Sequence, residues 1–275
     1  MLNDVTFGQY YPSNSFVHKL DSRVKLLLLI AYIVIIFIVN NFYGFLVVSF
    51  FLAMAIAFSK VPFGSVLKSL KAILIIIIIT VILNVFFYKP ENPTILFWII
   101  SKEALIFSAF MALRLILLVV GTSLLSLTTT PVALTDGIES LLKPLKYIKF
   151  PVHELALVMS IALRFIPILM NETDRIIMAQ KARGADFDSG NIIKKAKALI
   201  PVLIPLLISA FKKAEELGDA MDSRCYSGSK IRTKYRKLKM TWRDLVAFIF
   251  TTATIVGIIF TNMIGVIVWE ELCLF

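Results

Sequence analysis

Residues 104–128 read ALIFSAFMALRLILLVVGTSLLSLT, an apolar run in which Arg114 is the one charged side chain. A helix advances about 1.5 Å per residue, and about 20 apolar residues are needed to cross the hydrocarbon core of a bilayer. The run is long enough to do so. It predicts a transmembrane helix and, with it, an integral membrane protein.

Four further apolar runs extend this prediction to the whole chain, which has 275 residues, is 59% hydrophobic and has a mean hydropathy of +0.86. They cover residues 24–39, 42–58, 72–88 and 245–269. The first is short, so it needs helix tilt, local thinning of the bilayer, or a Lys25 side chain that reaches back to the interface. The fold class that we expect is an all-α integral membrane protein with about five transmembrane helices.

Basic residues orient the chain in the membrane. Of the 29 Lys and Arg residues, 20 lie between Pro131 and Arg243, and the loop after the third run contains only Lys89 and Lys102. Because cytoplasmic loops carry an excess of Lys and Arg, the N-terminus and the basic segment are predicted to be cytoplasmic. These charges are interleaved with apolar residues beside membrane spans. Membrane lipid with anionic headgroups is therefore the expected partner, and nucleic acid is not.

The predicted spans divide the chain into three parts. Residues 1–130 form an N-terminal membrane domain with four spans, 131–243 a cytoplasmic coupling segment, and 244–275 a last span. Within the coupling segment, two long amphipathic stretches cover residues 151–183 and 191–224. Each would form a helix about 50 Å long. Helices of this kind lie on a membrane surface or pack against a partner instead of crossing lipid.

Each long stretch ends in a tripeptide centred on arginine, and these are Ala182-Arg183-Gly184 and Ser223-Arg224-Cys225. A glycine directly after the last turn can take the left-handed conformation that ends a helix, which leaves the arginine pointing outward. Attraction to the helix dipole explains one such arginine. Two at equivalent ends favour a docking function, because a guanidinium can bind carboxylate and carbonyl acceptors at once.

A stripe of small residues recurs at every fourth position of the second stretch, at Ala210, Ala214 and Gly218. Small side chains let another helix backbone approach closely. We therefore predict that the two long helices cross at this stripe. Upstream of it, Pro201 and Pro205 each remove a backbone donor from one face, so the helix is expected to bend there.

Several motifs resemble those of one protein family, the transmembrane T components of energy-coupling factor transporters, a branch of the ABC importers. The resemblance covers nearly the whole chain. The motifs that carry it are QYYP at 9–12, HKLDSRVK at 18–25, TTP at 129–131, LTDGIE at 134–139, PVHELA at 151–156, ALRFIP at 162–167, QKARGA at 180–185 and AMDSRCY at 220–226. The second arginine motif departs from the Ala-Arg-Gly pattern of the family at both flanking positions.

The resemblance implies a scaffold in a prokaryotic cell membrane that holds two ABC-type ATPase subunits and a small membrane S component binding a vitamin. Arg183 would dock into one ATPase subunit and Arg224 into the other. The T component itself would have no catalytic residue, no metal and no cofactor, since ATP and Mg²⁺ would be bound by the ATPase subunits. Because the S component chooses the substrate, the identity of the vitamin is not written in this chain.

The sequence also bears on other functions. Residues 184–190 lack the Gly-Lys-Ser/Thr ending of a phosphate-binding loop, and His153-Glu154 has no second histidine at the spacing of a zinc helix. A membrane-embedded, lipid-modifying enzyme would need clustered intramembrane acids, which these spans almost lack. A self-sufficient channel or carrier would need polar spans or matching halves. The closest alternative is the membrane permease of a cobalt or nickel importer of the same superfamily.

Overall fold

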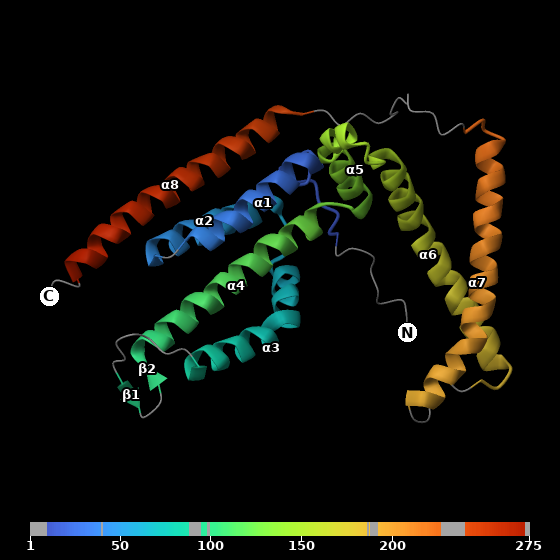
Figure 1. Cartoon of the computed structure of the whole chain (residues 1–275), viewed down its shortest axis with the longest axis horizontal. Coiled ribbons are helices and arrows are strands. Elements are labelled where there is room, and N and C mark those ends of the chain that lie inside the picture. Colours follow the sequence, from blue (N-terminus) through green and yellow to red (C-terminus); the bar gives the residue numbers. More distant parts are fainter. Residues whose placement is uncertain are drawn as a thin grey trace. The chain divides into compact units, whose positions relative to one another are not determined.

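The computed structural model describes residues 10–39, 41–87, 95–97, 100–185, 187, 192–226 and 240–272. The chain forms two compact units (Figure 1). The membrane unit comprises Gly8–Phe150 and Leu238–Phe275, and the two-helix unit comprises Met1–Phe7 and Pro151–Lys237. Each unit is described by itself below.

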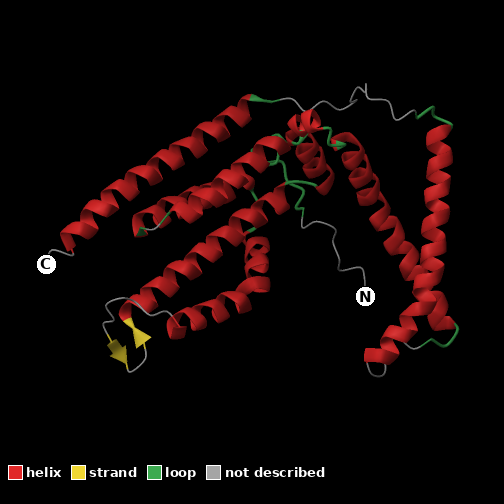
Figure 2. Cartoon of the chain, viewed as in Figure 1, coloured by secondary structure: helices red, strands yellow, loops and turns green. Residues whose placement is uncertain are grey.

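Helices dominate both units, which confirms the expected all-α membrane fold (Figure 2). The membrane unit contains α1 (Ser22–Ile38), α2 (Phe42–Ser59), α3 (Phe63–Phe87), α4 (Lys102–Thr128), α5 (Pro131–Leu141), the 3-10 helix η1 (Lys143–Ile148) and α8 (Trp242–Leu272). One addition was not anticipated. Strands β1 (Ile95–Phe97) and β2 (Ile100–Ser101) pair antiparallel between α3 and α4.

All five predicted apolar runs are helical, and their lengths bear on which can span a membrane. By length and composition, α2, α4 and Trp242–Met263 of α8 could each do so, as could α3, which is bent by 54° between Phe63–Lys71 and Ile73–Phe87. The remaining run, α1, has 17 residues and reaches about 26 Å. It is therefore short for a bilayer span, as the sequence indicated.

The core of the membrane unit lies between α1, α2, α4 and α8. Ile36, Phe45 and Val48 are almost fully buried there. Tyr32 of α1 packs against Gly121 of α4, where a Cβ would overlap the tyrosine ring. The Tyr32 hydroxyl donates a hydrogen bond to the Leu117 carbonyl oxygen at 2.8 Å. A glycine at this one position thus lets α4 approach α1 closely.

Arg114, the charged residue within the α4 run, holds α4 to the end of α1. Its Nη2 donates to the Val39 carbonyl oxygen at 2.7 Å, and its guanidinium lies 5.8 Å from the centre of the Phe45 ring. Val39 follows the last residue of α1, where helix carbonyls lack partners within the helix. Arg114 therefore pairs within the helix bundle.

A group of polar contacts, here called the junction, joins the ends of three helices of the membrane unit. Lys25 Nζ donates to the Thr128 carbonyl oxygen at 2.9 Å and to Thr129 Oγ1 at 3.2 Å, at the end of α4. The Asp244 carboxylate at the start of α8 accepts from the backbone N–H of Asp21 at 2.8 Å. Lys25 is buried in the junction, where carbonyl oxygens at the end of α4 that lack partners within the helix accept from it.

The two-helix unit consists of α6 (Val152–Ala182) and α7 (Ile192–Asp222), each 31 residues and so about 46 Å long. They pack on one another, and Gln180 Nε2 of α6 donates to the Pro201 carbonyl oxygen of α7 at 3.4 Å. Figure 1 shows that α7 changes direction within its first half, the part that contains Pro201 and Pro205. The expected bend is therefore present.

By length and composition α6 could also cross a membrane. The sequence favoured a surface or partner-bound helix instead, because its polar residues recur along one face. Exposed apolar side chains run along α7, which include Leu203, Leu207 and Phe211. Both helices therefore present surfaces that this unit alone leaves uncovered in the described residues.

Candidate docking site

The end of α6 has a defined backbone conformation. Gly184 has φ +87°, in the left-handed region where glycine is favoured. The Ala185 N–H donates to the Gln180 carbonyl oxygen at 3.0 Å, and the Gly184 N–H donates to the Lys181 carbonyl oxygen at 3.0 Å. This pair of bonds is a Schellman motif. The left-handed glycine that the sequence predicted here is present.

The end of α7 has the same conformation without a glycine. Cys225 has φ +56°, the Tyr226 N–H donates to the Met221 carbonyl oxygen at 3.0 Å, and the Cys225 N–H donates to the Asp222 carbonyl oxygen at 2.8 Å. A left-handed conformation costs a residue with a side chain about 1–2 kcal/mol. The hydrogen bonds of the motif offset this cost, so the departure of Ser223-Arg224-Cys225 from the family pattern does not alter the turn.

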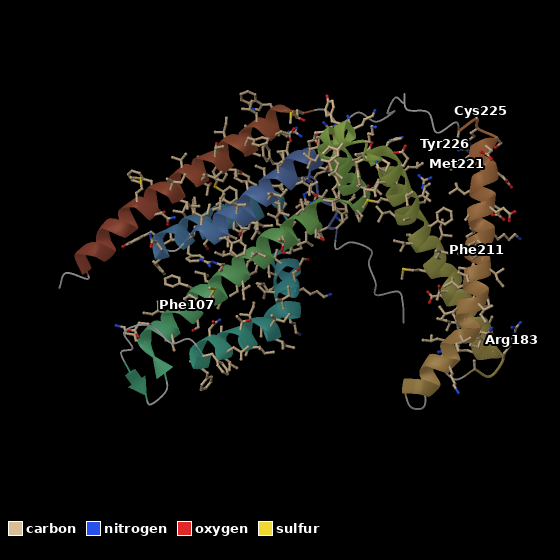
Figure 3. The ribbon with its side chains drawn as sticks, in the orientation of Figure 1. Phe107, Arg183, Phe211, Met221, Cys225 and Tyr226 are labelled. Atoms are coloured by element: carbon tan, nitrogen blue, oxygen red, sulfur yellow. The ribbon has the colours of Figure 1, made fainter. Side chains whose placement is uncertain are left out.

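The two turns place an arginine at the same point of each helix. Arg183 and Arg224 each directly precede the left-handed residue, and both side chains are exposed. Figure 3 labels Arg183 at the end of α6 and Cys225, the residue after Arg224, at the end of α7. Each lies at the negative end of its helix dipole, where a positive charge is favoured. An exposed guanidinium on a rigid turn can bind a planar carboxylate or backbone carbonyls of another protein. The structure thus gives equivalent geometry to the two helix ends that carry Arg183 and Arg224, here called the arginine tips.

The surroundings of the two tips differ in charge. Lys181 accompanies Arg183 on the last turn of α6, whereas Asp219 and Asp222 precede Arg224 on the last two turns of α7, and all of these residues are exposed. Among the described residues, the last turn of α6 is therefore basic, and the last two turns of α7 carry charges of both signs. A partner surface that suits one tip does not suit the other equally well.

The stripe of small residues lies away from the observed contact between the helices. Ala214 and Gly218 are exposed, and a Cβ built on Gly218 would meet nothing within 4 Å. The hydrogen bond between α6 and α7 instead involves Pro201. A crossing at Ala210, Ala214 and Gly218 therefore stays a prediction.

Residues of the junction were missed by sequence reasoning about function. One signal was present at Asp244, because Thr241 and Asp244 have the spacing of a capping box. The structure shows this cap, in which the Thr241 N–H donates to Asp244 Oδ2 at 2.6 Å. The second bond of the carboxylate, to Asp21, joins residues 223 positions apart. No local pattern signals a contact of that kind.

Comparison with known proteins places the chain in a family. The family model described as "Cobalt transport protein" (CbiQ) matches residues 13–235, which include both arginine tips. The chain belongs to this family, the CbiQ/EcfT family. Among curated relatives, the "Energy-coupling factor transporter transmembrane protein EcfT" of Clostridium kluyveri is 53% identical over 250 residues, which cover 90% of this chain and 93% of the relative.

Other EcfT proteins match as fully. That of Thermosediminibacter oceani is 47% identical over 267 residues, which cover 96% of this chain and 100% of the relative. That of Bacillus subtilis is 45% identical over 247 residues, which cover 89% of this chain and 93% of the relative. These matches confirm the resemblance recognised in the sequence. The chain is thus a multi-pass transmembrane protein of the energy-coupling factor transporter family.

Proposed function

We propose that this chain is the scaffold and coupling subunit of an energy-coupling factor importer for a vitamin or similar micronutrient. Two ABC-type ATPase subunits would bind its arginine tips, and a small membrane S component would bind the substrate. The observation that carries the proposal is the pair of helix ends with the same Schellman turn and an exposed arginine at the same position. Membership of the EcfT family supports it.

The arginine tips would bind the ATPase subunits as rigid helix ends. Because each arginine precedes a left-handed residue held by two backbone hydrogen bonds, its guanidinium starts from a fixed point at the end of a helix about 46 Å long. Closure of the ATPase pair on ATP would displace both tips. Since α6 and α7 pack on one another, the displacement would pass along the helices towards the membrane unit and the S component.

The division of labour follows from this arrangement. ATP and Mg²⁺ would be bound by the ATPase subunits, so the chain itself would have no catalytic residue and no cofactor. Residues 131–243 would be the coupling segment and would lie in the cytoplasm with the N-terminus, as the excess of Lys and Arg favours. Residues 1–130 and 244–275 would supply the membrane spans.

Affinity purification from native membranes tests the proposal. We expect two ATPase subunits and small membrane proteins to accompany the tagged wild-type chain, and the ATPase subunits to be lost from the Arg183→Glu, Arg224→Glu double variant. Matched controls reverse charges elsewhere on the same two helices, at the exposed Arg175 and Lys212. The control variant should keep its ATPase subunits. Equal recovery of ATPases with the double variant and the wild type would show that the arginines only cap their helices.

A cobalt or nickel importer is the second candidate, because the matching family model is described as a cobalt transport protein. The two functions use the same tips and differ in the membrane partner. Identification of the small membrane proteins that co-purify, followed by uptake of radiolabelled vitamins or ⁵⁷Co²⁺ into cells expressing the complex, separates them. Cobalt uptake that depends on Arg183 and Arg224 would favour the second candidate.

A further inference from the structure

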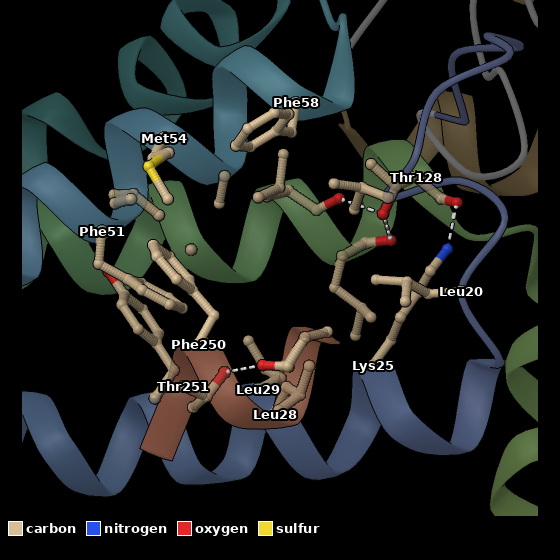
Figure 4. A pocket seen from close by; sticks show the side chains of 18 of the residues that line it. Leu20, Lys25, Leu28, Leu29, Phe51, Met54, Phe58, Thr128, Phe250 and Thr251 are labelled. Carbon is tan, nitrogen blue, oxygen red and sulfur yellow. Dashed lines mark hydrogen bonds between the residues drawn. The ribbon is translucent and has the colours of Figure 1, made fainter. Parts of the chain in front are cut away.

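The membrane unit contains a cavity of about 530 Å³ between α1, α2, α4 and α8 (Figure 4). Cavities of about 300–1,000 Å³ are of the size that holds small organic molecules. Stacked aromatic rings form part of its wall. The ring centres of Phe51 and Phe250 are 5.2 Å apart, and those of Phe51 and Tyr32 are 6.3 Å apart. The cavity is therefore a preformed space between packed helices.

The lining offers a ligand almost no polar group. Of the 20 lining residues, the ones with polar side-chain atoms are Lys25, Tyr32, Thr128 and Thr251. Each of these atoms already has an acceptor in the chain, because Tyr32 donates to the Leu117 carbonyl oxygen, Thr128 to that of Leu124 and Thr251 to that of Ala247. The chemistry that fits such a cavity is hydrocarbon.

Lys25 could in principle attract an anionic group into the cavity. Its ammonium has three N–H groups, and it donates to the Thr128 and His18 carbonyl oxygens and to Thr129 Oγ1. All three N–H groups therefore have acceptors within the junction. A charged substrate would find no partner inside the cavity, which argues against a role in substrate recognition.

The cavity opens at the surface of the membrane unit. Phe16, Phe58 and Val246 line it and are 37%, 56% and 39% exposed. Phe58 and Val246 belong to α2 and α8, two of the helices that are long and apolar enough to cross a membrane. Contact of these apolar side chains with water is unfavourable, whereas contact with lipid acyl chains is not. An apolar rim on helices that can span a membrane therefore suits acyl chains.

The exposed charged residues that neighbour the lining residues Leu20, Phe58 and Val246 in the sequence are positive. Lys19 precedes Leu20 of the lining, Lys60 follows Phe58 by two residues, and Arg243 precedes Val246 by three. The acids in the same segments, Asp21 and Asp244, are buried in the junction. A phosphate group at the rim would thus meet cations without meeting exposed carboxylates.

We propose that the cavity is a lipid-binding site that holds one acyl chain of an anionic phospholipid, with the phosphate beside Lys19, Lys60 and Arg243. The bound chain fills the space between α1, α2, α4 and α8. The proposal concerns the membrane unit alone and does not depend on the docking role of the arginine tips.

Matched alanine pairs on two helices test the site. Ala55 of α2 and Ala247 of α8 line the cavity, whereas Ala53 and Ala253 are exposed on the same helices. The full-length chain, purified with any bound partners, is equilibrated with an equimolar mixture of phosphatidylcholine and phosphatidylglycerol in detergent. After exchange into lipid-free detergent, retained lipid is counted by native mass spectrometry and identified by chromatography of the released material.

We expect the wild type, Ala53→Phe and Ala253→Phe to retain phosphatidylglycerol. Ala55→Phe and Ala247→Phe should retain it about tenfold less tightly, the effect of excluding about two methylene groups. A thermal melt of each preparation identifies a variant that fails to fold, and the pair on the other helix then decides. Equal retention by cavity and control variants, retention of detergent or free fatty acid instead, or no preference for phosphatidylglycerol would overturn the proposal.

Discussion

The Asp244 carboxylate accepts a hydrogen bond from the backbone N–H of Asp21 at 2.8 Å, although the two residues are 223 positions apart. Its other oxygen accepts from the Thr241 N–H. One buried side chain therefore caps α8 and ties its start to the start of α1. In this way the last helix of the chain is fixed to the first.

Asp244→Ala should destabilise the membrane unit. Both backbone N–H groups would lose their acceptor, and the Asp21 N–H is buried, where an unpaired donor costs about 1–3 kcal/mol. Thermal unfolding of the purified chain, followed by size-exclusion chromatography, measures the effect. Asp219→Ala, on an exposed position of α7, is the control and should leave the midpoint unchanged. The junction has no structural importance if both variants unfold with the wild type.

Arg114→Met should weaken the contact between α4 and α1. The Val39 carbonyl oxygen would lose a charge-assisted hydrogen bond, and such bonds contribute about 1.5–3 kcal/mol. Arg114→Lys keeps the charge and should recover part of the loss. The same unfolding assay compares the two variants. Equal stability of Arg114→Met and wild type would contradict the structural role.

Cys225→Gly should stabilise the end of α7 by about 0.5–1 kcal/mol, because glycine adopts a positive φ without the side-chain cost but loses more conformational entropy. Gly184→Ala should destabilise the end of α6 by about 1–2 kcal/mol. Hydrogen exchange of the Tyr226 and Ala185 amides reports the change, because each of them donates to the carbonyl oxygen five residues earlier in its turn. Faster exchange at Tyr226 in Cys225→Gly would be inconsistent with the assigned turn.

Gly218→Leu should uncouple ATP hydrolysis from uptake while assembly persists, if the small-residue stripe meets another helix in the complex. Within this unit a Cβ at Gly218 meets nothing within 4 Å, so the substitution leaves the fold of the chain intact. Ala220→Leu, on the opposite face of α7, is the matched control. ATPase activity and uptake are measured in the same proteoliposomes. Normal uptake by Gly218→Leu would refute a crossing at the stripe.

Stability should fall in mild acid because of His18. Burial lowers the pKa of His18 below its ordinary value of 6.5, the bond to the Tyr11 carbonyl oxygen opposes this, and the charge of Lys25 adds to it. The unfolded chain therefore binds a proton more readily than the folded one. The contribution is complete above about pH 6.5 and is lost as pH falls through the lowered pKa.

Thermal unfolding between pH 5 and 7.5 measures this dependence. His18→Gln removes the titrating group while keeping a donor for the Tyr11 carbonyl oxygen, which His18 Nε2 contacts at 2.9 Å. The wild type should lose more stability than the variant as pH falls. Parallel pH profiles would exclude His18 as the cause.

The membrane class, the five apolar helices and the two long helices that lead to Arg183 and Arg224 could all be predicted from the amino-acid sequence. These features rest on run length, periodicity and local turn signals, all of which act over a few neighbouring residues. The predicted run at 72–88 corresponds to the second arm of α3, Ile73–Phe87, and the helix extends nine residues further upstream because Phe63–Lys71 forms a separate arm before the 54° bend.

The contacts between residues far apart in the chain became known only from the packed fold. The bonds of Lys25 to Thr128 and of Asp244 to Asp21, and the cavity between α1, α2, α4 and α8, depend on how separate helices pack, and no local pattern encodes that packing. The backbone conformation of Cys225 could not be predicted from its residue type either. Its intrinsic preference disfavours a positive φ, but two backbone hydrogen bonds made by its neighbours outweigh that preference.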